Sequence, residues 1–138
     1  GARPSPEATI ARRDGGAVII APSSPVGAVG PVLAVPGITQ GLTSRRDTVV
    51  AVSPIVGGMA LKGPAARLME NLGEEASVVG VARRYAPFAR ALVIDPIDAH
   101  LAGAVGEVGI EPIVAPSIMD TPDHAAALAR VCLAGRAL

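Results

Sequence analysis

The chain has 138 residues, of which half are hydrophobic and 17% are charged, and its 12 basic and 12 acidic residues give a net charge of zero. This composition is typical of one globular domain with a real core, and it excludes a disordered chain. The balanced charge argues against nucleic acid as the main partner, because binding to phosphates along a strand needs a basic face.

The single cysteine, Cys132, excludes an internal disulfide and a cysteine-based zinc site. No run of about 18 apolar residues is present, so we expect no membrane span. Prolines and charged residues between Pro4 and Arg13 interrupt any apolar signal segment, which predicts a cytoplasmic location. The first residue is Gly1 and not a methionine, which we interpret as the mark of a processed or partial sequence.

Helix and strand patterns alternate along the chain. In chain order we expect a helix from Ser5 to Gly15, a strand at residues 17–21, a loop at 22–27, a short helix at 31–35, a strand at 48–52, a helix at 64–72, strands at 77–81 and 91–94, a helix at 95–108, a strand at 113–115 and a helix at 121–135. This order predicts one Rossmann-like α/β unit over residues 1–138, a mostly parallel sheet with helices on both faces. Such sheets bind ligands beyond the carboxyl ends of their strands.

The most informative segment follows the strand at residues 48–52 and runs from Ser53 to Gly63. Gly57 and Gly58 remove side chains near Lys62, so that backbone amides and one ammonium group can approach an anion. The spacing fits neither the Walker A motif nor the dinucleotide fingerprint. The residues therefore predict a loop that cradles an anion, against the alternative that Lys62 is simply solvated.

A second loop follows the strand at residues 17–21 and also leaves a carboxyl end. Ser23 and Ser24 offer two hydroxyl groups ahead of a short helix, which suits a phosphate or pyrophosphate. The alternative is an ordinary turn, since serine and proline are common in turns. We expect the two loops to line one shared crevice.

The other polar residues carry weaker signals. Asp95 and Asp98 are three residues apart, and so are Asp120 and Asp123, but an N-cap and a first-turn acid explain Asp95 and Asp98 without a metal. Both histidines are isolated, and no Ser-His-Asp arrangement supports a hydrolase. The run 83–85, Arg-Arg-Tyr, is interpreted as surface after a strand.

Taken together, the two loops resemble the 2-phospho-L-lactate transferase family of coenzyme F420 biosynthesis. The resemblance lies in residues 21–25 (APSSP), 30–38 (GPVLAVPGI), 52–58 (VSPIVGG) and 61–65 (LKGPA), and it continues in 81–85 (VARRY) and at Ile118 and Met119. Ser24 and Arg84 depart from the family, which usually has asparagine and commonly has histidine there. The match covers the C-terminal part of proteins about twice as long.

This resemblance implies a magnesium-dependent transferase that acts on the deazaflavin Fo. A GDP-activated phospholactyl or phosphoenolpyruvyl group is transferred to the terminal hydroxyl of Fo, and GMP leaves. The Mg²⁺ ligands are expected in the N-terminal part, and a homodimer is plausible for the family. The implied nucleotide- and substrate-binding residues here are Ser23, Ser24, Pro25, Gly30, Ser53, Pro54, Gly57, Gly58, Lys62 and Gly63.

Two alternatives remain open at this point. One is a non-catalytic regulator of the same superfamily that binds a nucleotide or nucleotide-sugar. The other is an inactive fragment that holds both loops without the metal carboxylates. The Ser-Pro-Ile-Val-Gly-Gly run at residues 53–58 favours the transferase.

Overall fold

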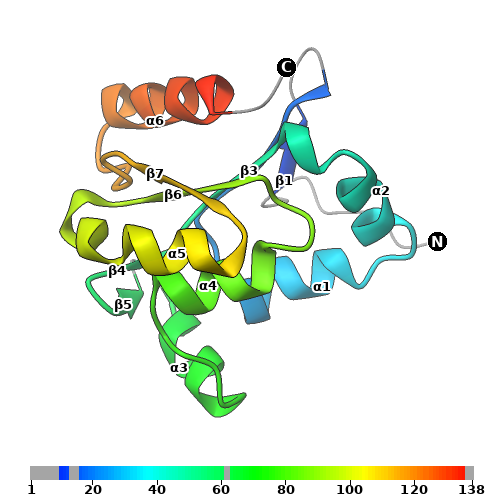
Figure 1. Cartoon of the computed structure of the whole chain (residues 1–138), viewed down its shortest axis with the longest axis horizontal. Coiled ribbons are helices and arrows are strands. Elements are labelled where there is room, and N and C mark those ends of the chain that lie inside the picture. Colours follow the sequence, from blue (N-terminus) through cyan, green and yellow to red (C-terminus); the bar gives the residue numbers. More distant parts are fainter. Residues whose placement is uncertain (1–9, 13–15, 61–62, 136–138) are drawn as a thin grey trace.

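Four parallel strands form the framework of the molecule (Figure 1). The computed structural model describes residues 10–12, 16–60 and 63–135. The main sheet has the order β1-β2-β3-β6-β7, and β1 is antiparallel to β2. Its strands are β1 (Ile10–Arg12), β2 (Val18–Ile20), β3 (Val49–Val52), β6 (Ala91–Ile94) and β7 (Glu111–Val114). The parallel strands β2, β3, β6 and β7 are neighbours in chain order, so each connection moves the chain by one strand in the same direction along the sheet.

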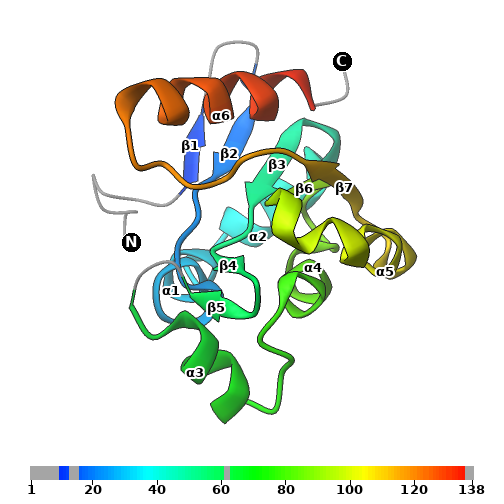
Figure 2. The ribbon, with the colours of Figure 1, turned by 90° about the vertical axis from the view of Figure 1, so that its left-hand side faces the viewer.

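The helices cover both faces of this sheet. They are α1 (Gly30–Leu33), α2 (Ile38–Ser44), α3 (Ala65–Asn71), α4 (Val78–Tyr85), α5 (Ala102–Val108) and α6 (Pro122–Ala134). Figure 2 shows α6 on one side of the strands and α1, α4 and α5 on the other. This arrangement confirms the expected Rossmann-like α/β fold.

Each face of the sheet has its own buried cluster. Under α6, Val50 and Val52 of β3 and Val93 of β6 pack in one cluster with Leu128 and Cys132, and the side chains in this cluster are aliphatic or sulfur-containing. On the other face, Ile20, Leu92 and Ile94 pack with residues of α3, α4 and α5. Every residue of β3 and β6 is buried, as expected for central parallel strands.

The first expected helix is wrong in the part that the structure describes. Residues Ile10–Arg12 form β1, which pairs with β2 in the register Ile10 to Ile20. The serine–proline start at Ser5 lies outside the described residues. Cross-strand pairing with an apolar strand outweighs the weak helical signal of this short segment.

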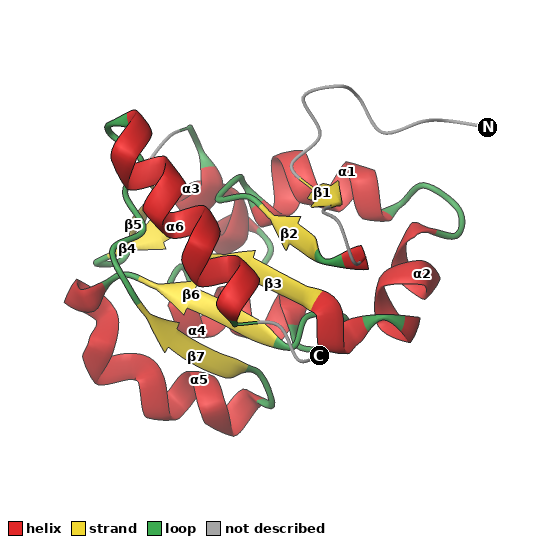
Figure 3. Cartoon of the chain, turned by 90° about the horizontal axis from the view of Figure 1, so that it is seen from above, coloured by secondary structure: helices red, strands yellow, loops and turns green. Residues whose placement is uncertain are grey.

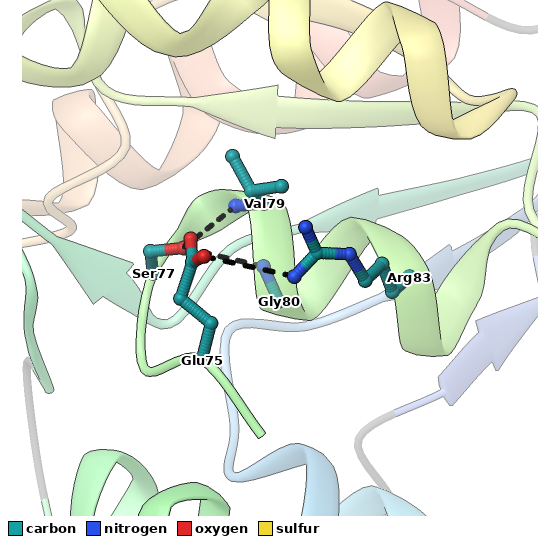
Figure 4. A network of polar contacts seen from close by, with 5 residues as sticks. All are labelled: Glu75, Ser77, Val79, Gly80 and Arg83. Atoms are coloured by element: carbon teal, nitrogen blue, oxygen red, sulfur yellow. Dashed lines mark hydrogen bonds and ion pairs between the residues drawn. The ribbon is translucent and has the colours of Figure 1, made fainter. Parts of the chain in front are cut away.

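The expected strand at residues 77–81 is also wrong, because these residues begin helix α4. The Ser77 hydroxyl caps the helix by accepting from the backbone amides of Val79 (3.1 Å) and Gly80 (3.2 Å), as Figure 4 shows. The residues Val78, Val81, Ala82 and Tyr85 are buried. Their spacing is helical, and the β-branched residues alone suggested a strand. The Arg-Arg-Tyr run at 83–85 therefore lies within a helix.

The structure also differs from the expected elements elsewhere in the chain. Residues 38–44 form helix α2, and the glycine-rich loop contains a two-stranded hairpin of β4 (Ile55–Val56) and β5 (Met59–Ala60). The helix expected at residues 95–108 is divided into a 3-10 helix, Pro96–Leu101, and α5. A π-helical turn, Pro25–Val29, occupies part of the loop expected after β2, and a short 3-10 helix, Arg46–Thr48, precedes β3.

Candidate functional site

The loops that follow the parallel strands all lie at the carboxyl edge of the sheet. Seen from above in Figure 3, the chain leaves β2, β3, β6 and β7 on the same side, because these four strands are parallel. This edge is where open α/β sheets bind their ligands. Described residues form two clefts there.

The first cleft lies between the chain leaving β2 and the link from β7 to α6. Its volume is about 580 Å³, and we name it the β2–β7 cleft. It is lined by Ala21, Pro22, Ser23, Ser117, Ile118, Met119 and Asp120. Ile118 and Met119 are 46% and 47% exposed. The cleft therefore combines apolar walls with the hydroxyl of Ser23.

The carboxylate of Asp95, which directly follows β6, holds the wall of this cleft that the β7–α6 link forms. Asp95 caps the Pro96–Leu101 helix by accepting from the Ile97 amide (3.2 Å), which confirms the expected N-cap. Its second oxygen accepts from the Ser117 amide at 3.2 Å and faces the Ser117 hydroxyl at 3.4 Å. Ser117 is fully buried. The β7–α6 link is thus fixed to the end of the neighbouring strand.

The second cleft lies beside the β4–β5 hairpin, and we name it the hairpin cleft. Its volume is about 600 Å³, and it is lined by Gly58, Met59, Ala60, Gly63, Pro64, Ala66 and Arg67. Gly57 and Gly58 form the two-residue turn with φ of 61° and 80°, a left-handed backbone that favours glycine. The amide of Gly57 donates to the carboxylate of Asp98 at 3.0 Å.

The predicted binding residues are distributed between these clefts and the interior. Ser23 lines the β2–β7 cleft, whereas Gly58 and Gly63 line the hairpin cleft. In the described part of the chain, Ser23 and these two glycines thus line different clefts, and a crevice shared by the two loops stays a prediction. Lys62 lies outside the described residues.

Several of the predicted residues have structural contacts of their own. The Ser24 hydroxyl accepts from the Gly27 amide (2.9 Å) and caps the π-helical turn. The buried Ser53 hydroxyl donates to the Ile55 carbonyl (3.0 Å) and accepts from the Ile55 amide (3.1 Å). Pro25 and Pro54 are buried, and Gly30 begins α1. Their ligand contacts remain predictions.

Ionisable side chains of the described residues differ in their environment. Burial raises the pKa of the Cys132 thiol to about 11, so this cysteine is a thiol at neutral pH and a poor nucleophile. At the rim of the β2–β7 cleft, a hydrogen bond from His124 lowers the pKa of Asp120. Burial raises the pKa of Tyr85. In residues 10–12, 16–60 and 63–135, no group of three or more His, Cys, Asp or Glu could hold a metal ion.

Two contributors to the site were missed from the sequence. Nothing in the sequence singled out Ser117, because its role depends on a partner 22 residues away. Asp98 was expected only as a first-turn acid, and it is one, but it is also buried and accepts a hydrogen bond from the hairpin. The three-residue spacing to Asp95 was the available signal, and it was attributed to helix capping.

Comparison of the sequence with known proteins identifies the family of this chain. The model of the family "2-phospho-L-lactate transferase CofD" matches residues 1–114. The 2-phospho-L-lactate transferases of Methanothermobacter thermautotrophicus and Methanocaldococcus jannaschii are 37% and 38% identical over 95% and 94% of this chain. This chain belongs to the CofD family. The phosphoenolpyruvate transferase of Kitasatospora aureofaciens is 34% identical over 96% of the chain.

The CofD match concerns part of a longer protein. The aligned residues make up 42%, 40% and 42% of those three relatives. This chain thus spans less than half of the length of the CofD proteins that it matches.

A helix that crosses a membrane needs about 20 mostly apolar residues. In the described ranges, no single helix is long and apolar enough to cross a membrane. The segments Pro25–Leu33 and Ile38–Ser44 meet the length and composition criteria only as a pair, and the pair is bent by 90°.

Proposed function

We propose that this CofD-family chain is part of a transferase that moves a phospholactyl or phosphoenolpyruvyl group from a GDP-activated donor to the deazaflavin Fo. In this reaction the terminal hydroxyl oxygen of Fo forms a bond to the phosphorus of the phosphoacid. The bond from that phosphorus to GMP breaks, GMP leaves, and the hydroxyl proton is lost. The observation that carries the proposal is the match of about 95% of the chain to phospholactate and phosphoenolpyruvate transferases.

The clefts support a role in holding the donor. Phosphoryl transfer depends mainly on positioning and on the stabilisation of charge, and the carboxyl edge of this sheet offers a hydroxyl, backbone amides and an arginine. We assign Ser23 in the β2–β7 cleft to the phosphates of the donor. Gly58, Gly63 and Arg67 in the hairpin cleft, with Lys62 beside them in sequence, are assigned to a second anionic contact.

The magnesium ion expected for this reaction does not fit the described residues. No group of three candidate ligands exists there, and Asp95 and Asp98 already accept hydrogen bonds from backbone amides. The ligands of this ion are therefore expected outside the described residues.

Calorimetric titration of the chain with GDP, in the presence of Mg²⁺, tests the donor site. We expect GDP to bind, and Ser23→Ala to weaken its affinity about tenfold, because one hydrogen bond to a charged phosphate is worth about 1.5 kcal/mol. Ser44→Ala is the matched control. Its hydroxyl donates to the Gly41 carbonyl in α2, and it lines neither of the two clefts. This control should leave GDP affinity unchanged.

A second titration with Fo separates the alternatives. Binding of both GDP and Fo supports the transferase. Binding of a nucleotide-sugar without Fo would instead support the non-catalytic regulator. A folded, monodisperse chain that binds none of these ligands would contradict a donor site in this chain.

A further inference from the structure

The Pro96–Leu101 helix and its N-cap bond to a segment that borders each of the two clefts. Its N-cap residue, Asp95, bonds to the wall of the β2–β7 cleft. Asp98, in the first turn of the same helix, bonds to the hairpin that borders the other cleft. Two carboxylates of a single helical turn therefore bond to two different segments, the β7–α6 link and the β4–β5 hairpin.

Asp98 supplies the hairpin with a partner that the hairpin itself lacks. In the β4–β5 hairpin Val56 pairs with Met59, and Gly57 and Gly58 are the central turn residues. The amide of the first central residue has no acceptor within such a two-residue turn. Asp98 is 2% exposed, and its carboxylate accepts this amide of Gly57 at 3.0 Å. A buried carboxylate that accepts a backbone amide forms a strong hydrogen bond, and losing it is costly.

Packing places the hairpin turn directly against the same helix. A Cβ atom built on Gly57 would lie 3.6 Å from the Cδ1 atom of Ile97. Ile97 is the residue between Pro96 and Asp98, and its amide donates to Asp95. A shift of this helical turn would thus displace the hairpin turn and the Ser117 contact together.

We propose that Asp95 and Asp98 are positioning residues that couple the two clefts, so that the hairpin cleft and the β2–β7 cleft keep one joint arrangement. The coupling rests on the contacts of the chain alone. Only the identity of the ligand that the joint arrangement serves rests on the proposed function. The two acids orient other groups, and neither is assigned a contact with substrate.

Amide hydrogen exchange of the ¹⁵N-labelled chain, measured by NMR, tests the coupling. The amides of Gly57 and Ser117 report on the two contacts, and the amide of Ala51 in central β3 reports on global unfolding. In Asp98→Ala we expect exchange at Gly57 to be at least about tenfold faster, relative to Ala51. Exchange at Ser117 should also rise severalfold, although its own acceptor is intact. In Asp95→Ala we expect the larger rise in exchange at Ser117 and a severalfold rise at Gly57.

Control variants keep this test decisive. Glu107→Ala removes an exposed carboxylate from α5 and should change neither reporter. If Asp98→Ala does not fold, Asp98→Asn replaces it, since the amide group keeps the size and one acceptor oxygen but loses the charge. We then expect a smaller rise at Gly57, with Ser117 changing in the same direction. A rise at Gly57 alone, or no rise at either reporter, would overturn the coupling.

A GDP titration of the same variants separates this inference from the proposed function. Weaker GDP binding in both Asp95→Ala and Asp98→Ala, with coupled exchange, supports both proposals. Coupled exchange in a chain that binds no GDP would leave the coupling intact and would count against the donor site. Unchanged GDP affinity together with independent exchange of the two amides would overturn the coupling alone.

Discussion

At Gly80 the backbone of α4 and the loop before it come into direct contact. A Cβ atom at this position would overlap the Glu75 carbonyl oxygen and lie 2.8 Å from the carbonyl carbon. The loop is held there by Ser77, which caps α4, and by the ion pair of Glu75 with Arg83 at 3.6 Å (Figure 4). The obstructing atoms belong to the backbone, so a side chain could not move them out of the way cheaply.

We therefore expect Gly80→Ala to lower the free energy of unfolding by about 3 kcal/mol, because the overlap forces α4 away from the loop. Urea denaturation measures this change. Gly103→Ala is the matched control in α5, where a Cβ atom meets nothing within 4 Å. The control should stabilise the chain by about 0.5–1 kcal/mol, since alanine favours a helix over glycine. Equal effects of the two substitutions would contradict the close contact.

At the scale of elements, one arginine joins the carboxyl ends of two helices. The guanidinium group of Arg46 donates to the carbonyl of Ala86 at 2.9 Å and to the carbonyl of Gly109 at 2.6 Å. These residues are the C-caps of α4 and α5. A cation at a helix C-terminus is favourable, and a planar guanidinium can serve two carbonyl groups at once.

Arg46→Ala should lower the free energy of unfolding by about 2 kcal/mol, because two charged hydrogen bonds are lost and both helix ends are left without this partner. Arg46→Lys should recover less than half of that loss, since an ammonium group is a point charge without the fork geometry. Thermal or urea unfolding checks both values. Arg130→Ala, on the exposed side of α6, is the control and should change stability by less than about 0.5 kcal/mol. A full recovery by lysine would contradict the bridging role.

An element could be predicted from the sequence when the residues that define it lie within or beside it. The helices α3 and α6 have clear stop or start residues in Gly73 and Thr121, and they were predicted to within a residue or two. Helix α4 was mistaken for a strand, because its β-branched residues suggest one and the cap at Ser77 went unrecognised. Strand β1 gave no reliable signal, since its pairing with β2 is a tertiary contact.

The clefts were less predictable than the elements, because they depend on which loops meet. Figure 2 shows the link from β7 running back across the carboxyl edge to the start of α6. That path brings Ser117 and its neighbours opposite Ser23, although β2 and β7 are separated by two strands in the sheet. Strand order and the face taken by the last helix are properties of the whole molecule. Ser23 could therefore be predicted as a cleft residue, whereas the opposite wall could not.

The same strand order predicts how strongly the backbone amides of each strand are protected from hydrogen exchange. Strand β7 pairs with β6 through the amides of Glu111, which donates to Arg90, and Ala115, which donates to Ile94. Along a strand the backbone N–H and C=O groups point alternately to its two sides. The backbone groups of the intervening positions, Pro112 and Val114, therefore face away from β6. Proline has no amide hydrogen, and Val114 is 45% exposed. The outer edge of β7 therefore offers little for another strand to pair with.

We expect the amide of Val114 to exchange at least about a hundredfold faster than that of Val93, which lies in a strand paired on both sides. The amide of Ile113, whose alternation directs it toward β6, is the internal control and should be protected more strongly than Val114. Hydrogen exchange followed by NMR gives all three rates in one experiment. Protection of Val114 at the level of Val93 would mean that another strand covers this edge, and dilution of the sample would then tell a second copy of the chain from an internal contact.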